Sequence, residues 1–172
     1  CMKTVSLVPL LVGMFLTCTT TYLTAQNHTY VSAAAGIPEL LSIGMRYQTV
    51  GINIGASVST FPTATTNLSV MLDAMILFGA PQREAPYGRW YVRPGVAYLY
   101  DDGEYKTESY IYANGRVGYV LLLNNPVSLC FDAGVMVELQ KTSVQKKPSS
   151  GWNFNFEFPV LPSIGVTVLY EL

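Results

Sequence analysis

The chain has 172 residues, of which 50% are hydrophobic and only 12% are charged, about half the charged share of an ordinary soluble domain. Ten Lys and Arg against eleven Asp and Glu leave a formal net charge of −1, which excludes a nucleic-acid binder held by a basic surface and an intrinsically disordered chain. One His and three Cys are too few for a zinc module or a disulfide scaffold.

Residues 1–25 have the features of a cleaved signal peptide. Lys3 supplies a short positive start, residues 5–16 form an apolar run, and a polar stretch leads to a small-residue cleavage site at Ala25. The apolar run is shorter than the roughly 20 residues that a helix needs to cross a bilayer, although a short membrane anchor is the alternative. The sequence therefore predicts an exported protein with a single mature domain at residues 26–172.

In the mature domain, apolar residues recur at every second position, which is the period of a β-strand with two unlike faces. The alternation is clearest from Trp152 to Leu172, where every second residue, starting at Trp152, is apolar or aromatic. We call such a set of alternate positions the apolar parity of a strand, and the positions between them the polar parity. Taken in chain order, it predicts eight strands, at about residues 28–36, 41–47, 52–59, 69–78, 90–98, 110–121, 127–140 and 152–172.

The connections between these strands differ at the two rims of the predicted sheet. Turns at 48–49, 79–88 and 124–126 would share a rim with both chain ends, and a turn at 36–38 and loops at 61–67, 101–107 and 141–151 would form the other rim. An even number of strands, with mostly short turns on one side and longer loops on the other, is typical of outer-membrane barrels. The 79–88 connection is long for such a turn.

The two parities indicate which face meets lipid. The polar parity carries Gly, Ser, Asn and isolated charges, rather than the Lys, Glu and Thr expected of a strand that faces water. We therefore expect the apolar parity to face hydrocarbon. The predicted fold is an all-β, eight-stranded, antiparallel, up-and-down transmembrane β-barrel whose interior is filled by side chains.

Charges enclosed in such an interior must pair, because isolated buried charges are strongly destabilising. The charges on the polar parity nearly balance, and we predict that they form an interior charge network of Arg46, Asp73, Arg93, Arg116, Asp132, Glu138 and Glu157. Aromatic residues near strand ends predict an interfacial girdle of Trp90, Trp152, Phe154, Phe156 and Tyr170. Three prolines inside strands predict a bulge or bend at Pro94, Pro159 and Pro162.

Few residues offer chemistry. His28 is the only imidazole, and with a Ser and an acidic partner it could serve the kind of reaction that membrane-embedded lipid-modifying barrels perform. An acidic group, Asp101, Asp102, Glu104 and Glu108, could hold a divalent cation or be solvated. Lys141, Lys146 and Lys147 could meet lipopolysaccharide phosphates or only solubilise a loop. We expect no catalytic residues, no metal and no cofactor.

Two segments carry a resemblance to a known group. Residues 146–165, which contain Lys146-Lys147-Pro148 and Pro159 to Gly165, and the hairpin at 38–47 resemble small outer-membrane β-barrel proteins of Bacteroidota. A mature start at Gln26 is also common in that group. The resemblance implies an outer membrane of a Gram-negative bacterium and folding by the barrel-assembly machinery. The chain departs from the usual pattern by ending in Leu172 instead of Phe or Trp.

The sequence thus predicts a monomeric integral outer-membrane barrel with no open pore, surrounded by outer-membrane lipids or lipopolysaccharide. Its expected role is structural, or binding through the loops at 61–67, 101–107 and 141–151. Two alternatives stay open. One is a lipid-modifying enzyme that uses His28, and the other is a soluble, secreted, lipocalin-like carrier of a lipophilic ligand.

Overall fold

The computed structural model describes residues 27–37, 40–60, 66–83, 85–124, 126–146 and 159–172. These residues form eight strands: β1 (His28–Ile37), β2 (Leu41–Thr49), β3 (Ile52–Thr60), β4 (Thr66–Phe78), β5 (Trp90–Asp102), β6 (Lys106–Asn124), β7 (Val127–Gln145) and β8 (Val160–Glu171). Within the described ranges there is no helix long and apolar enough to cross a membrane. The predicted signal peptide at 1–25 lies outside them.

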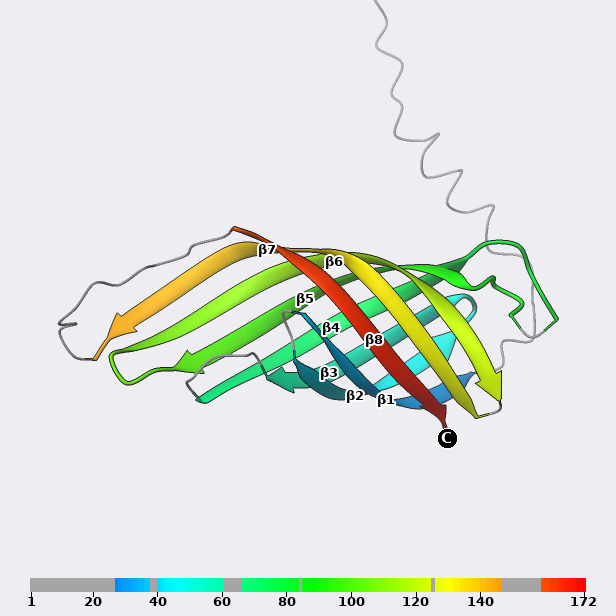
Figure 1. The fold of residues 1–172 in the computed structure, drawn as a ribbon, viewed down its shortest axis with the longest axis horizontal. Helices are drawn as coiled ribbons and strands as arrows, with labels where there is room; N and C mark the ends of the chain where they lie inside the picture. The colour runs from blue at the N-terminus through cyan, green and yellow to red at the C-terminus, as the bar shows by residue number, and fades with distance from the viewer. Residues whose placement is uncertain (1–26, 38–39, 61–65, 84, 125, 147–158) are drawn as a thin grey trace, which may run out of the picture.

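Each strand pairs antiparallel with the next, and β8 pairs with β1, so the sheet closes into a barrel (Figure 1). The predicted all-β class, the eight strands and their antiparallel up-and-down order are therefore confirmed. Closure removes every sheet edge along the paired part of the strands, which satisfies the backbone hydrogen bonds of the described residues, among which there is no helix.

The strands tilt steeply around the barrel. A row of directly paired residues leaves β1 at Ile37, crosses Ile164 on β8 and descends strand by strand to Thr49 on β2. Thr49 follows Gln48, the partner of His28 at the other end of β1. Following the paired residues once around the barrel therefore displaces the row along β1 by nearly the whole length of that strand. This displacement is the stagger that a closed barrel requires.

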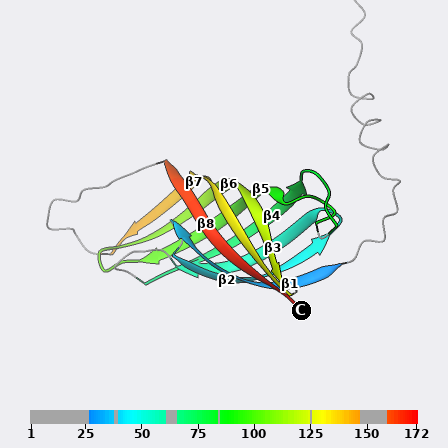
Figure 2. The ribbon, with the colours of Figure 1, turned by 45° about the vertical axis from the view of Figure 1, so that its right-hand side comes forward.

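The barrel has two unlike rims. The terminus rim contains His28 and Leu172, together with the 79–88 turn, and the extended rim is the opposite end, where β5, β6 and β7 reach farthest (Figures 1 and 2). The last two of these strands run well past their predicted ends, and the loop expected at 101–107 shrinks to a tight turn between Asp102 and Lys106. At the extended rim the added residues 106–109 and 141–145 are all polar except Val144, so the apolar alternation does not reveal them.

Part of the 79–88 turn lines the interior at the terminus rim, where Ala85, Pro86 and Tyr87 share a cavity with strand residues. Its Gln82 and Ala85 exchange two backbone hydrogen bonds, and Ala85 is buried. Gly79 and Gly88 adopt positive φ angles of 118° and 85°, which residues with a Cβ rarely adopt.

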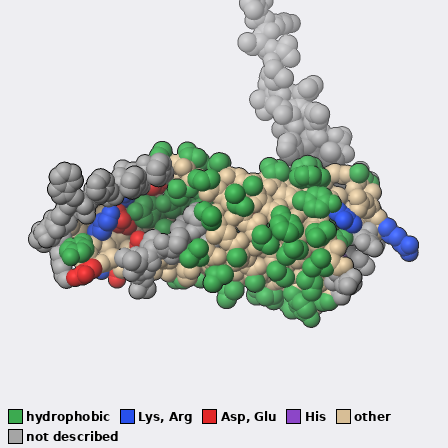
Figure 3. Space-filling model, viewed as in Figure 1, with side chains coloured by type: hydrophobic (Ala, Val, Ile, Leu, Met, Phe, Trp, Pro, Cys, Tyr) green, Lys and Arg blue, Asp and Glu red, His purple; other side chains and the backbone are tan. Residues whose placement is uncertain are grey.

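Side chains alternate between an exposed outer face and a largely buried inner face. Along β3 the alternation is strict from Ile52 to Thr60. The apolar parity faces outward, and in Figure 3 hydrophobic atoms spread over the middle of the wall while charged atoms gather toward the two ends. Two apolar clusters lie inside the barrel: Met71, Ala97, Leu99, Tyr112 and Met136 toward the extended rim, and Met75, Tyr91, Cys130 and Leu169 toward the terminus rim.

Pro94 and Pro162 lie within strands without a shift of register, so the bulge predicted there is absent, whereas Pro159 lies just before β8 and not inside a strand. Pairing continues in register on both sides of Pro94 and through Pro162, although the β4–β5 ladder lacks the pairs opposite Pro94. Proline has no N–H to donate, so the ladder is interrupted there without a slip. The register shifts lie between β6 and β7 instead, at Ile111/Tyr112 and at Leu122/Asn124.

Candidate functional site

Five of the residues predicted for the interior charge network lie together inside the barrel. They are Arg46 on β2, Asp73 on β4, Arg93 on β5, Arg116 on β6 and Asp132 on β7, and none is more than 6% exposed. All occupy inward-facing positions of the strand alternation. The steep stagger of the strands brings them to one level, between the two apolar clusters.

The two carboxylates bridge the arginines. Asp73 accepts a hydrogen bond from Arg46 Nη2 on one oxygen and from Arg93 Nη2 on the other, at 2.8 Å. Asp132 accepts from Arg93 Nη1 at 3.1 Å and lies 3.5 Å from Arg116 Nη1. Arg93 therefore stands at the centre and donates to both carboxylates, an arrangement that compensates the loss of hydration of each buried charge.

Two neutral residues complete the network, and the sequence analysis missed both. Asn53 Oδ1 accepts a hydrogen bond from Arg46 Nε at 2.7 Å, and the hydroxyl of Tyr91 donates to Asp132 Oδ2 at 3.0 Å. Both lie on the inward parity of their strands, so the alternation contained the necessary signal. Both residues are uncharged, so the pairing requirement of buried charges does not point to them.

Gly118 makes room for the Tyr91 ring. A Cβ at Gly118 would fall on the ring and on the carbonyl of Phe131, closer than real Cβ atoms approach. We expect Gly118→Ala to displace Tyr91 from Asp132 and to lower the free energy of unfolding by about 1–3 kcal/mol, as overpacked cores do. Urea unfolding of the refolded barrel measures this. The matched variant is Gly115→Ala, because a Cβ there meets nothing within 4 Å; equal effects of the two variants would contradict the assignment.

The other two predicted members are not part of this cluster as described. Glu138 lies farther along β7 than Asp132 toward the extended rim, by about 20 Å at the usual rise of a strand, and it pairs with Tyr112. The selection by parity placed it on the correct face but could not give its height in the barrel. Glu157 lies outside the described residues.

Of the predicted girdle, Trp90 and Tyr170 are each 50% exposed on the outer wall near the terminus rim. Trp152, Phe154 and Phe156 lie outside the described residues. Pairing adds an aromatic row that the sequence analysis did not assemble, since Phe78, Trp90, Tyr119 and Phe131 each pair directly with the next. The rings of Trp90 and Tyr119 meet edge to face, with centroids 5.2 Å apart. Finding this row needs the strand register, which the sequence alone does not provide.

Charges at the extended rim pair with one another. Lys146 Nζ donates to Asp102, which also accepts from Thr107 at 2.7 Å. Glu108 lies 2.9 Å from Lys106 Nζ and 3.5 Å from Lys141 Nζ. The acidic residues and lysines that the sequence suggested as separate cation and phosphate sites thus partly neutralise each other. In the described part of the chain, no group of three or more His, Cys, Asp or Glu is placed to hold a metal.

The Glu108 cluster predicts a pH dependence at the extended rim. Burial alone would raise the pKa of Glu108, but hydrogen bonds from Lys106 and Tyr110 and nearby lysine charges lower it below its ordinary 4.5. A lowered pKa means that folding favours the charged form, so this stabilisation is complete above pH 4.5 and is lost as the pH falls through the lowered pKa.

We therefore expect hydrogen-exchange protection of residues 106–112, corrected for intrinsic rates, to fall on acidification below pH 4.5. Glu108→Gln should abolish this local pH dependence. The cluster would have no such role if the protection profile of the variant followed that of the wild type at every pH.

His28 belongs to a different pair at the terminus rim. Its Nδ1 lies 2.6 Å from Glu171 Oε1, so the pair joins the start of β1 to the end of β8. An imidazole oriented by a carboxylate is part of a nucleophile-activating arrangement. Catalysis would also require a Ser hydroxyl, and in the described ranges none is among the contacts of His28. The other ring neighbour of His28 is Tyr30.

Comparisons with protein-family models, with curated proteins and with solved structures found no match for this chain. The resemblance to small outer-membrane barrels of Bacteroidota therefore stays a prediction. Any function proposed for the chain rests on its own residues and their geometry.

Proposed function

We propose that the protein is an integral outer-membrane β-barrel that spans the lipid bilayer with its eight strands. The observation that carries this proposal is the outer wall, where large apolar side chains are exposed on every strand, among them Ile43 at 70%, Leu72 at 62% and Ile164 at 61%. Soluble monomers rarely expose contiguous apolar patches larger than a few hundred Å². Hydrocarbon would cover this surface.

Strand length and charge placement support the same proposal. The shortest strands, β2 and β3, have 9 residues each, which is within the roughly 9–11 that a tilted strand needs to cross a bilayer. The charged side chains of the middle of the barrel, Asp73, Arg93 and Asp132 among them, point inward. Lipid-facing charges at this depth would destabilise the protein strongly.

We infer that the barrel has no open pore. Arg93 joins carboxylates from β4 and β7 across the interior, and an apolar cluster lies on each side of this level. The cavity beside Arg93 and Arg116 has a volume of only about 10 Å³, about the space of one water molecule. Side chains thus obstruct the route along the axis.

By the usual arrangement of outer-membrane barrels, the terminus rim would face the periplasm and the extended rim the outside. The proposed role is structural, or binding through the extended rim, in a monomer surrounded by outer-membrane lipids and lipopolysaccharide. Export through the signal peptide and insertion by the barrel-assembly machinery belong to the same proposal. Of the loops expected to bind, residues 61–65 and 147–151 lie outside the described residues.

Membrane extraction tests the proposal. Membranes from cells that express the full chain are washed with alkaline carbonate, and the pellet is run on a gel with and without boiling. The protein should stay in the pellet and migrate differently before boiling, as intact barrels do. Release into the supernatant would contradict the proposal and favour a soluble carrier.

Lipid A mass spectrometry tests the catalytic alternative in the same cells. We expect identical lipid A from cells that express the wild type and His28→Asn. A modification present with the wild type and absent with the variant would overturn the proposed non-enzymatic role.

A further inference from the structure

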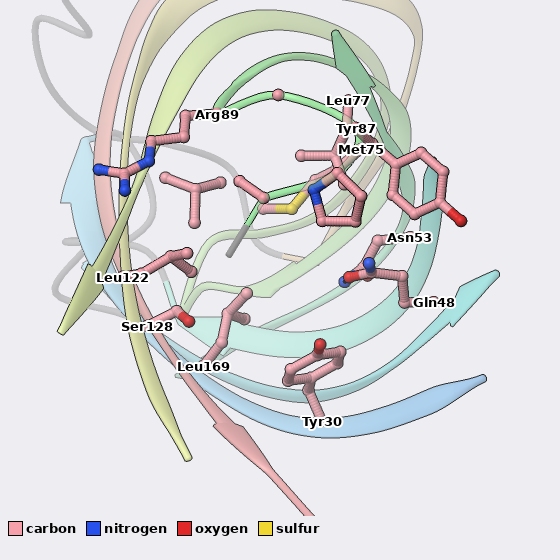
Figure 4. A pocket seen from close by; sticks show the side chains of 14 residues that line it. Tyr30, Gln48, Asn53, Met75, Leu77, Tyr87, Arg89, Leu122, Ser128 and Leu169 are labelled. Carbon is pink, nitrogen blue, oxygen red and sulfur yellow. The ribbon is translucent and has the colours of Figure 1, made fainter. Parts of the chain in front are cut away.

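A cavity of about 110 Å³ lies just inside the terminus rim, beneath the 79–88 turn (Figure 4). Ala85, Pro86 and Tyr87 of this turn line it together with strand residues of the barrel interior. An engineered apolar cavity of about 150 Å³ in another protein holds benzene. The cavity here is smaller, so it suits an apolar body no larger than a ring or a short chain of about six heavy atoms.

The walls of the cavity divide by chemistry. Apolar side chains from β4, β6 and β8 line one part: Met75, Leu77, Leu122 and Leu169. Polar side chains from β1, β2 and β3 line another part, Tyr30, Gln48 and Asn53, whereas Ser128 on β7 lies between Leu122 and Leu169 of the apolar part (Figure 4). Such a division selects a ligand that has an apolar body and a polar end.

The polar wall offers mainly hydrogen-bond donors. Asn53 uses its carbonyl oxygen to accept from Arg46 and its amide to donate to Gln48 Oε1 at 3.5 Å. The Gln48 amide hydrogens are thereby left for the cavity, and the Tyr30 hydroxyl points toward its middle in Figure 4. Arg89 is the charged residue among the described lining residues, and Figure 4 shows its guanidinium directed away from the middle of the cavity.

We propose that this cavity binds a small organic molecule with an apolar body of about six heavy atoms and a carboxylate or carbonyl oxygen. The apolar wall receives the body, and the donors of Gln48 and Tyr30 receive the oxygen. Because the Asn53 side chain also contacts Arg46, the ligand would sit at the edge of the charge network. This inference does not require a membrane location, so its success or failure is distinct from that of the proposed function.

Methyl NMR of the full chain, refolded in detergent micelles, tests the inference. Three probes of similar body are titrated: benzoate, acetophenone and toluene. Benzoate or acetophenone should shift the methyl signals of Met75, Leu122 and Leu169 saturably, and toluene should bind at least about tenfold more weakly, because the donors would stay unpaired. Toluene binding as tightly as the other two, or the absence of any saturable shift, would overturn the proposal.

Two neighbouring leucines provide matched variants. Leu122→Phe fills the cavity, whereas Leu121→Phe adds the same bulk on the outer wall, where Leu121 is 37% exposed. The first should weaken benzoate binding by about tenfold or more and the second should leave it unchanged. Equal effects would contradict the site.

Gln48→Leu keeps the test valid if Leu122→Phe fails to fold. This variant should weaken the binding of benzoate and leave that of toluene unchanged. Benzoate affinity equal to that of the wild type would remove Gln48 from the site and overturn the proposed donor wall.

Discussion

Asp73→Leu will lower the free energy of unfolding by about 3–5 kcal/mol, because it removes the carboxylate that pairs two buried guanidinium groups. Arg93 would keep its hydrogen bond to Asp132, and Arg46 would keep its hydrogen bond to Asn53. Both arginines would lose Asp73, the carboxylate that they share. Urea unfolding of the refolded barrel, followed by tryptophan fluorescence, measures the loss. It is the largest effect expected of any single substitution in the network.

Two other variants calibrate this result. Asp102→Leu removes an equally short ion pair, with Lys146, but at an exposed position, and should change stability little. Arg116→Leu should cost less than Asp73→Leu, because Asp132 retains Arg93 and Tyr91. A loss for Asp73→Leu no greater than that for Asp102→Leu would show that the network does not stabilise the barrel.

Leu72→Arg will destabilise the barrel by about 2–4 kcal/mol when it is embedded in phospholipid vesicles, because an arginine near the bilayer midplane loses its hydration. Leu72 is 62% exposed and lies midway along β4. If water covered this surface, the substitution would instead be nearly neutral. Reversible urea unfolding in vesicles distinguishes the two environments.

Leu172→Arg is the matched control for depth. Leu172 is 71% exposed but lies at the terminus rim, where the predicted penalty for arginine is only about 0–1 kcal/mol. Equal penalties at Leu72 and Leu172 would contradict a hydrocarbon layer around the middle of the barrel.

The strand count and the face of each strand could be predicted because a period of two ties every residue to one face. A slip of one position would have moved Arg46, Arg93 and Asp132 to the outer wall, so the charges themselves restrict the register. The sequence could not give heights along the axis. Those heights depend on the stagger between strands, so the alternation cannot separate Glu138 from Asp132, which lies six residues nearer the terminus rim on β7.

Features formed by residues that are far apart in the chain also could not be predicted from the sequence. The length of the 79–88 turn does not reveal that Ala85, Pro86 and Tyr87 line the barrel interior, because that depends on space left by residues of other strands. The cavity beneath it joins Tyr30 near one end of the chain with Leu169 near the other. At the extended rim, Lys146 and Asp102 become neighbours because β5, β6 and β7 pair beyond their apolar parts.

The most direct test of a lipid-facing wall is a nitroxide scan along β4, residues 67–77, of the protein reconstituted in vesicles. Each label is probed with oxygen, which concentrates in hydrocarbon, and with a water-soluble nickel complex. The proposed orientation predicts maximal oxygen accessibility at Leu68, Val70, Leu72, Ala74 and Ile76, with minima at the residues between. Maximal nickel accessibility at those same five positions would show that water covers the wall, and would contradict the membrane-spanning barrel.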